Sequence, residues 1–395
     1  MTMKATSNAE LIRFVVLIAM APAIGLGIAR FAYALLLPEM KLSLGWTYSE
    51  AGWMNTINAA GYLIGALLTA LLAKRFSLIW LVQGGVLVSV IAILLTGFFE
   101  HFFMLSALRF LAGVSGALCF VAGGAIAATL AVESSNRSGL ILSLFYAGPG
   151  VGIVLSGLLV PFYMDHFGSD AWAAAWWFLG FLAFVLAMLS FSARLPRSEK
   201  KAQQTANLPP FRLLKNAPVL MGYLAFGAGY IGYMTFMFAY LKQAGASTVQ
   251  LASFWATIGG ASMLSPWIWG AVMAKGRNGT ATAFLTFVTL VGSLMPLLST
   301  SYLSLFASAA IFGSAFFSVP AATTAFAKRN ADPSEWPYVI GVFTVVFGLG
   351  QVLGPVLSGY ISDSTGKLYH GLIWGCVFLV IGVILPLLQK DAQHR

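Results

Sequence analysis

The feature that most constrains this chain is a series of apolar runs, each about as long as a bilayer is thick. The runs at 78–97 and 172–191, for example, are almost entirely apolar, and about 20 helical residues cross the roughly 30 Å hydrocarbon core of a membrane. Only helix bundles and closed barrels span a membrane, because every backbone polar group must be satisfied within the protein. Barrel strands alternate in polarity over about ten residues. These uniformly apolar runs therefore predict helices.

Composition supports a bilayer as the solvent. Apolar residues make up 59% of the 395 residues, charged residues only 9%, and the mean hydropathy is +0.87. A soluble domain averages about 45–50% apolar and about 25% charged residues. The formal net charge of +10 does not indicate nucleic acid as a partner, because the basic residues lie in short loops and not along one helix face.

Turn and charge signals divide the chain into twelve predicted spans, which indicates an all-α membrane protein. The first apolar stretch is too long for a cleavable signal and has no small-residue cleavage site after it. A polar, proline-containing segment at 194–217 separates an expected six-helix bundle at 1–193 from a second at 218–395. The spans are expected at about 11–37, 48–73, 78–98, 103–132, 138–161, 171–193, 218–241, 250–273, 280–299, 302–327, 337–361 and 370–389.

The distribution of Lys and Arg predicts the orientation. If both termini are cytoplasmic, 17 of the 22 basic residues face the inside, three face the outside, and Arg30 and Arg109 lie within spans. Short cytoplasmic loops of membrane proteins carry an excess of positive charge. We therefore expect a multi-pass protein of the inner (plasma) membrane with both termini in the cytoplasm.

The two halves of the chain resemble each other. The glycines at 139, 148, 152 and 157 in the fifth span match those at 341, 350, 354 and 359 in the eleventh, with a constant offset of 202 and no gap. Repeated halves are typical of secondary transporters. The match predicts two pseudo-symmetric six-helix bundles.

Several motifs resemble the YbfB/YjiJ-like branch of the major facilitator superfamily. They are GLGIARFAY at 25–33 with LLPEM at 36–40, GYLIG at 61–65, and RFLAGVSGA at 109–117. The glycine and proline spacing at 341–355 is similar to a motif of antiporters in this superfamily, where it is usually on the fifth helix. The superfamily's loop after span two normally has an aspartate before its basic residues, whereas residues 71–76 read LLAKRF. The resemblance implies the major facilitator fold and secondary transport by alternating access, with proton coupling.

Arg30 and Arg109 are the two charges expected within the membrane. Each is expected six or seven residues inside the outer end of its span, so Arg30 would lie roughly 10 Å from the outer surface. A charge at depth costs about 2.5 kcal/mol or more and normally faces a cavity or the bundle interior. The 12 acidic residues lie in loops or at helix ends, so a carboxylate of the substrate is the expected partner of these guanidiniums. Alternatively, Arg30 snorkels or binds carbonyls, and Arg109 serves packing and gating.

Asn55, Asn58 and Tyr62 share one face of span two. Cavity lining is one role for them, and hydrogen bonding between helices is the alternative. Aromatic and amide residues elsewhere are weaker substrate-binding candidates, because many such side chains only pack or anchor a helix at the membrane interface. These further candidates are Tyr33, Tyr146, Tyr230, Tyr233, Trp255 and Gln351.

Coupling and hinge residues are expected at helix ends and at glycine–proline clusters. Glu39 and Glu133 are the best placed acids for carrying a proton. Clusters of glycine and proline permit kinks that rocking of two halves requires, although they also permit close static packing. The hinge candidates are Gly148, Pro149, Gly350, Gly354 and Pro355.

The sequence predicts a transporter and not an enzyme. The four histidines lie in loops or the tail and form no metal-binding cluster, and Cys119 and Cys376 lie in apolar runs. We expect no cofactor and a monomer whose partners are lipids, a small-molecule substrate, most readily an anion, and protons. The alternatives are a proton-coupled multidrug or sugar efflux antiporter and, from another class, a non-transporting membrane sensor or scaffold.

Overall fold

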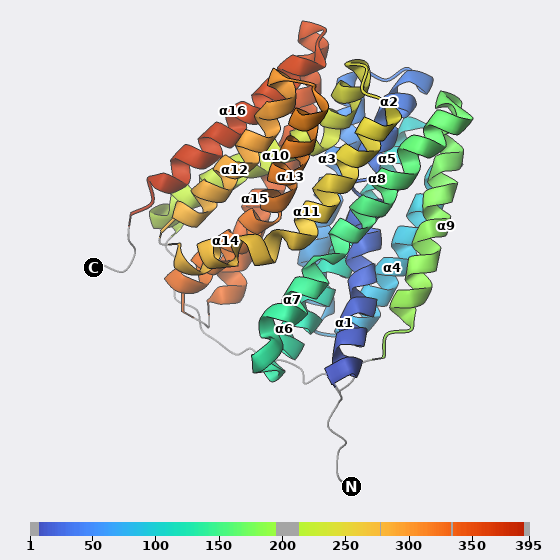
Figure 1. Cartoon of the computed structure of the whole chain (residues 1–395). Helices are drawn as coiled ribbons and strands as arrows, with labels where there is room; N and C mark the ends of the chain where they lie inside the picture. Colours follow the sequence, from blue (N-terminus) through green and yellow to red (C-terminus); the bar gives the residue numbers. More distant parts are fainter. Residues whose placement is uncertain (1–7, 195–212, 277, 333–334, 391–395) are drawn as a thin grey trace.

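A computed structural model describes residues 8–194, 213–276, 278–332 and 335–390, which form helices and no strand (Figure 1). The predicted connection at 194–217 falls largely on residues 195–212, outside the described part of the chain. Within the described residues, eleven helical segments are long and apolar enough to cross a membrane. Helix α11 (Thr248–Lys275) is less apolar than these eleven segments, but its 28 residues are long enough to cross a membrane. It completes the predicted set of twelve.

The first half of the chain forms six membrane-crossing segments, four of which contain two or more helical elements. Their bounds are α1 Asn8–Pro22, η1 Ala23–Ile28 and α2 Tyr33–Ser43; α3 Tyr48–Leu72; α4 Leu78–Thr96; α5 Phe102–Ala117, η2 Leu118–Ala122 and α6 Gly123–Glu133; η3 Ser135–Arg137, α7 Ser138–Tyr146 and α8 Gly148–Phe167; and η4 Ser169–Ala171 with α9 Trp172–Phe191.

The second half repeats this number of segments. Besides α11, its elements are η5 Leu213–Asn216 and α10 Ala217–Gln243; α12 Thr280–Leu298; α13 Tyr302–Phe316 and α14 Ser318–Asn330; α15 Trp336–Thr365; and α16 Leu368–Leu387.

Equivalent helices of the two halves begin with the same local device. The Thr47 hydroxyl accepts from the Glu50 backbone N–H at 3.2 Å, and the Glu50 carboxylate accepts from the Thr47 N–H at 2.8 Å. Ser247 and Gln250 make the same reciprocal pair at 3.3 and 2.8 Å. Each capping box satisfies backbone donors at a helix N-terminus, so α3 and α11 both start where their sequences place the cap.

The repeated glycines bring equivalent helices into contact. A Cβ added to Gly148 of α8 would lie 2.3 Å from the Ala19 carbonyl oxygen of α1. In the second half, a Cβ added to Gly350 of α15 would lie 2.1 Å from the Leu224 oxygen of α10. Small residues allow such approach of helix backbones in membranes. The repeat seen in the sequence is therefore a repeated packing of span five on span one and of span eleven on span seven.

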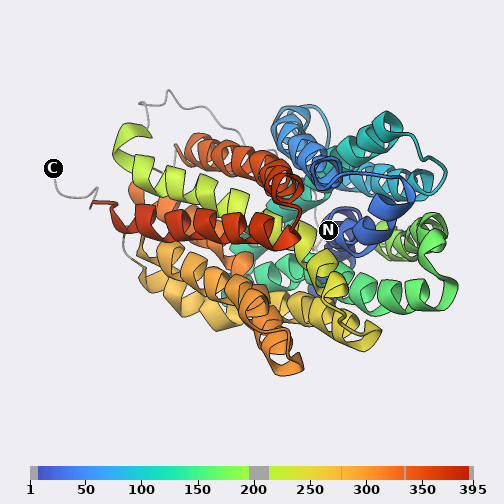
Figure 2. The ribbon, with the colours of Figure 1, turned by 90° about the horizontal axis from the view of Figure 1, so that it is seen from above.

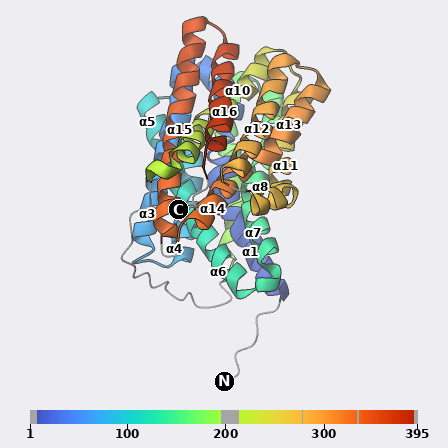
Figure 3. The same cartoon turned by 90° about the vertical axis from the view of Figure 1, so that its left-hand side faces the viewer.

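Each half of the chain forms one bundle, and the two bundles lie side by side (Figure 2). They meet along α3 with α15 and along α8 with α11. The α3–α15 contact runs from Tyr48 beside Gly359 to Leu63 beside Gly348. At the end of the molecule that carries the N-terminus, α6 and α14 lie apart, whereas the opposite ends of the bundles meet (Figures 1 and 3).

Replacing Gly350 by alanine is expected to destabilise the protein by about 1–3 kcal/mol, because the new methyl group overlaps a backbone oxygen that cannot move aside. Gly341→Ala, on the same helix, is the matched control, since a Cβ there meets no atom within 4 Å. Thermal unfolding of the purified variants in detergent measures both. Equal melting temperatures for the two variants would contradict this packing role.

Candidate binding site at the bundle centre

The first span is interrupted in the middle of the N-terminal bundle. After α1 the chain continues as the π-helix η1, then as turns over residues 29–32, and it becomes α-helical again at Tyr33. A second π-helix, η2, interrupts the fourth span, and its Cys119 lies against Gly25 of η1. Such π-segments are rare and frequently mark functional sites. The break at 29–32 contains Arg30.

The first helix extends further than the sequence predicts. The first span was expected to end at residue 37, but α2 continues through Pro38 to Ser43. A proline removes one hydrogen bond and can kink a helix without ending it. Arg30 lies 13 residues (43 − 30) before the end of this helix, and its depth below the membrane surface stays a prediction.

Backbone carbonyls and one amide surround the guanidinium of Arg109. It donates to the oxygens of Ala29 at 2.5 Å, Arg30 at 3.2 Å and Met54 at 3.4 Å, and to the Asn55 side-chain oxygen at 2.9 Å. Its carbon lies 4.7 Å from the ring centroid of Tyr33. These acceptors come from spans one and two, so Arg109 joins three helices. The arrangement corresponds to the packing alternative for this residue.

Arg30 has a different environment. Its side chain is also buried, with 4% exposure, but the Nη2 atom has no hydrogen-bond partner. The guanidinium carbon lies 5.2 Å from the ring centroid of Tyr62 and 5.7 Å from that of Phe31. Phe31 in turn meets Phe316 of the other bundle at 6.4 Å, and Phe316 lies 6.1 Å from Tyr230. Aromatic faces attract a cation but leave its N–H donors unused, so Arg30 retains an unpaired donor that an anion can accept.

The polar residues of α3 connect helices. Asn55 donates to the Thr235 hydroxyl of α10 at 2.8 Å, in addition to accepting from Arg109. Asn58 donates to the Arg109 carbonyl at 2.9 Å, and its oxygen has no partner. Tyr33 donates to the Ala51 carbonyl at 2.8 Å. Asn55 thus links the Arg109 cluster to the second bundle.

The C-terminal bundle contributes Tyr230 and Gln351 opposite Arg30. The Gln351 amide donates to the Tyr230 hydroxyl, and its buried oxygen has no partner. The Tyr230 ring stacks beside Phe226, Phe316 and Phe347. The candidate site therefore has an unpaired donor on one bundle and an unpaired acceptor on the other.

Three other predicted residues make contacts elsewhere. Tyr146 is 42% exposed and packs beside Phe120 and Phe145 in the first bundle. Tyr233 is 3.0 Å from the Ser308 hydroxyl and stacks on Phe312, within its own bundle. Trp255 packs beside Gly157 at the α8–α11 contact, and its ring N–H has no partner. Of these contacts, only that of Trp255 with Gly157 joins the two bundles.

Two acidic residues tie the bundles together at the closed end. Buried Glu39 of α2 forms an ion pair with Lys242 of α10. Asp363 of α15 accepts from the backbone N–H groups of Tyr48 and Ser49, both at 2.8 Å, at the start of α3. A carboxylate is stabilised at a helix N-terminus, and here it belongs to the other bundle. Glu133, the second coupling candidate, is exposed at the end of α6.

The hinge candidates differ in their local structure. The fifth span is interrupted at Ala147, and Gly148 and Pro149 begin the new helix α8. Gly354 and Pro355 lie inside α15, which is one helix of 30 residues. Gly350 and Gly354 pack against the Leu224 and Ala228 carbonyls of α10. Of these two glycine–proline clusters, only the one at Gly148 and Pro149 coincides with a break in its helix.

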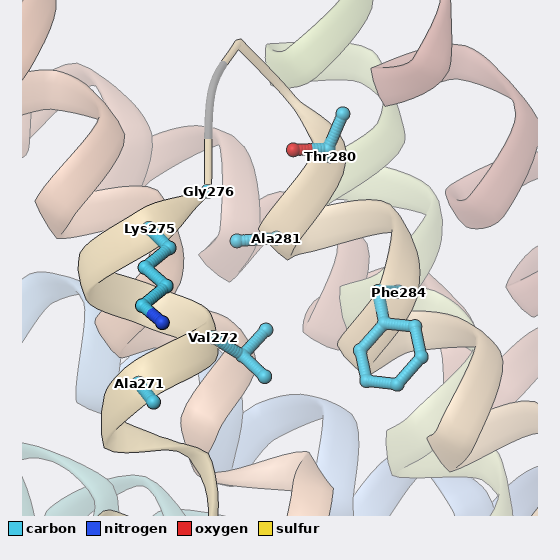
Figure 4. Close-up of a pocket in the computed structure, with 7 residues that line it drawn as sticks. All are labelled: Ala271, Val272, Lys275, Gly276, Thr280, Ala281 and Phe284. Carbon is cyan, nitrogen blue, oxygen red and sulfur yellow. The ribbon is translucent and has the colours of Figure 1, made fainter.

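A separate cavity of about 370 Å³ lies between α11 and α12 at the end of the bundle (Figure 4). Its lining is mainly apolar, with Lys275 and Thr280 as the polar members. None of the predicted site residues lines it. We therefore place the candidate site at Arg30 and not in this cavity.

Sequence analysis missed several residues of the centre and of the closed end. Lys242 and Asp363 were counted only as charges at span ends. The chain has 31 phenylalanines, so nothing distinguishes Phe316 or Phe347 in the sequence. The one signal for Thr235 is the offset of 202, which makes it equivalent to Tyr33 of the interrupted first span.

The two bundles, the central site and the ties at one end define a membrane transporter fold. The profile of a family described as "Uncharacterised MFS-type transporter YbfB" matches residues 22–387. The chain therefore belongs to this branch of the major facilitator superfamily, whose members are transporters and not enzymes, as its first-helix motif predicted.

Relatives and solved structures agree with this assignment. The chain is 24% identical over 394 residues to the inner membrane transport protein YdhP of Escherichia coli O157:H7, with 94% of each chain covered. It is 22% identical over 347 residues to the MFS-type transporter Ent638_1421 of Enterobacter sp. (strain 638), with 87% of each covered. We conclude that it is a multi-pass protein of the inner membrane.

Two solved structures share the fold at low identity. One is a bacterial homologue of the human lysosomal transporter Spinster in an inward-facing and occupied conformation, with a TM-score of 0.76, 13% identity, and 98% and 97% of the two chains covered. The other is the nucleoside transporter NupG, with a TM-score of 0.71, 12% identity, and 95% and 98% covered.

Substitutions of the two arginines are expected to affect the stability of the protein differently. Arg109→Met leaves buried carbonyls without a donor and should lower the free energy of unfolding by about 3 kcal/mol. Arg30→Met removes an unpaired buried charge and should leave the melting temperature unchanged or higher. Thermal unfolding in detergent compares the two variants directly. A larger loss for Arg30→Met would reverse the assignment of structural and binding roles.

Proposed function

We propose that this protein is a secondary active transporter that moves a small organic anion across the inner membrane by alternating access. The unpaired Nη2 atom of Arg30, buried beside Tyr62, carries the proposal. A guanidinium binds carboxylate oxygens through paired hydrogen bonds. None of the contacts that the described residues make with Arg30 involves an acidic side chain, so the substrate would supply the negative charge.

The position of Arg30 between the bundles suits transport. Arg30 and Tyr62 belong to the first bundle, whereas Tyr230 and Gln351 belong to the second. A ligand that contacts both would favour the state in which the bundles are close to each other, since a ligand shifts a conformational equilibrium by its differential affinity for the two states. The excess of basic residues in the loops supports cytoplasmic termini, and we propose a monomer.

The ion pair of Glu39 with Lys242 supports Glu39 as the coupling residue. It joins the bundles at the end where they meet, and Glu39 itself is buried. A proton on Glu39 would neutralise the carboxylate and remove its attraction for Lys242. Protonation would therefore weaken the closed end and link proton binding to the exchange between states.

Arg30→Met is expected to abolish saturable uptake of organic anions into proteoliposomes, because the positive partner of the substrate is lost. Arg30→Lys should retain part of the uptake, since a point charge replaces a bidentate donor. Arg75→Met, in an exposed loop, is the control and should transport normally. Normal uptake by the Arg30→Met variant, or transport of lipophilic cations alone, would refute the anion site and favour an efflux antiporter for drugs.

Glu39→Gln is expected to loosen the closed end, because the neutral amide keeps the shape of the side chain but loses the ion pair with Lys242. Spin labels at Leu42→Cys and Val249→Cys, two exposed positions near the ends of α2 and α11, report separation of the bundles once Cys119 and Cys376 are replaced. The distance between the labels should be longer in the Glu39→Gln protein than in the protein that keeps Glu39. Asp165→Asn, at an exposed site on α8, should leave the distance unchanged. An unchanged distance in the Glu39→Gln protein would contradict a role of Glu39 in coupling.

A further inference from the structure

A set of parallel aromatic rings lies beside the Arg30 site. Tyr223, Phe226 and Tyr230 follow one face of α10, and their planes lie within 10° of the next ring along the helix. All three stack beside Phe347 of α15, with centroids 4.6, 6.0 and 5.8 Å away and interplanar angles of 6°, 13° and 9°. The four rings therefore form one aligned group, which we call the aromatic stack.

This alignment differs from most other aromatic packing in the chain. Phe31 meets Phe316 at 85°, and Phe238 meets Trp255 at 87°. Edge-on and offset arrangements are both favourable in protein interiors, so hydrophobic packing alone does not require four parallel planes. Parallel planes do present a flat surface to a neighbouring group.

The aromatic stack is accessible at Phe347 and adjoins the unpaired charge. Tyr223, Phe226 and Tyr230 are buried, but Phe347 is half-buried. The next residue, Gly348, contacts Leu63, which follows Tyr62 on α3. Tyr230 connects the two features, because its ring belongs to the stack and lies 6.1 Å from Phe316, which meets Phe31 beside Arg30 at 6.4 Å. A charged donor and a half-buried ring of the stack thus belong to one site.

We propose that the site takes a carboxylate attached to a planar aromatic body, with the carboxylate on Arg30 and the ring against Phe347. This inference rests on the proposed anion site and adds the shape of the substrate. A flat ring would extend the aromatic stack, whereas a saturated ring of similar size would lose the parallel contact. The two bundles would then hold different parts of one ligand: Arg30 its charge and Phe347 its ring.

Calorimetric titration of the purified protein with four probes tests the proposal: 2-naphthoate, its saturated analogue decahydronaphthalene-2-carboxylate, the neutral 2-naphthamide, and succinate, an acid without a ring. We expect 2-naphthoate to bind about two- to tenfold more tightly than the saturated acid, as aromatic pairing allows. Phe347→Leu should abolish this preference, and Phe347→Tyr should retain it. Phe178→Leu is the control, because Phe178 of α9 stacks on Tyr163 of α8 at 5.3 Å and is not part of the aromatic stack, and it should keep the preference.

The outcomes separate this inference from the proposed function. Equal affinity for the two carboxylates, or a preference that survives Phe347→Leu, overturns the aromatic substrate class. Binding of succinate that depends on Arg30, without binding of 2-naphthoate, overturns the aromatic class and leaves the anion site intact. Equal binding of 2-naphthamide and 2-naphthoate overturns the anion site itself.

Discussion

The interaction on which the centre of this protein depends is the set of hydrogen bonds made by the Arg109 guanidinium. The first span breaks at residues 29–32, and such a break leaves carbonyl groups in a region without water, where an unsatisfied backbone group is costly. A guanidinium offers five donors in a fixed plane. That of Arg109 donates hydrogen bonds to the backbone oxygens of Ala29, Arg30 and Met54. One side chain thereby stabilises the break and fixes spans one, two and four together.

This arrangement determines the role that remains for Arg30. Because Arg109 binds the Arg30 carbonyl, the backbone at this residue is held in place. The Arg30 side chain then lies between Tyr62 and Phe31 with one donor unused. Two arginines at neighbouring positions can therefore have different functions. One is bound by the protein's own oxygens, and the other is available to an anion.

Pseudo-symmetry explains much of the framework but little of the site. The capping boxes at Thr47 and Ser247 and the glycine contacts at Gly148 and Gly350 occur once in each half. Arg30 has no equivalent, since the offset of 202 places Gly232 at its position in the second half. The repeat therefore builds two similar bundles. Residues that differ between the halves make the central site unequal: the first bundle contributes the charge of Arg30, and the second contributes the aromatic stack.

The sequence by itself determined the twelve-helix fold, the family, the repeat and the presence of two charges within the membrane. These follow from local signals: apolar length, cap residues, glycine spacing and short motifs. It left two roles open for each of Arg30 and Arg109, substrate binding on the one hand and contacts within the protein on the other.

Only the tertiary structure distinguished the two arginines and brought Lys242 to Glu39, Asp363 to Tyr48, and Phe347 to the central site. The physical reason is that a guanidinium's role depends on which oxygens surround it, and an aromatic ring's role on which face is left uncovered. Both depend on contacts between helices that are far apart in the chain, and these contacts have no local sequence pattern.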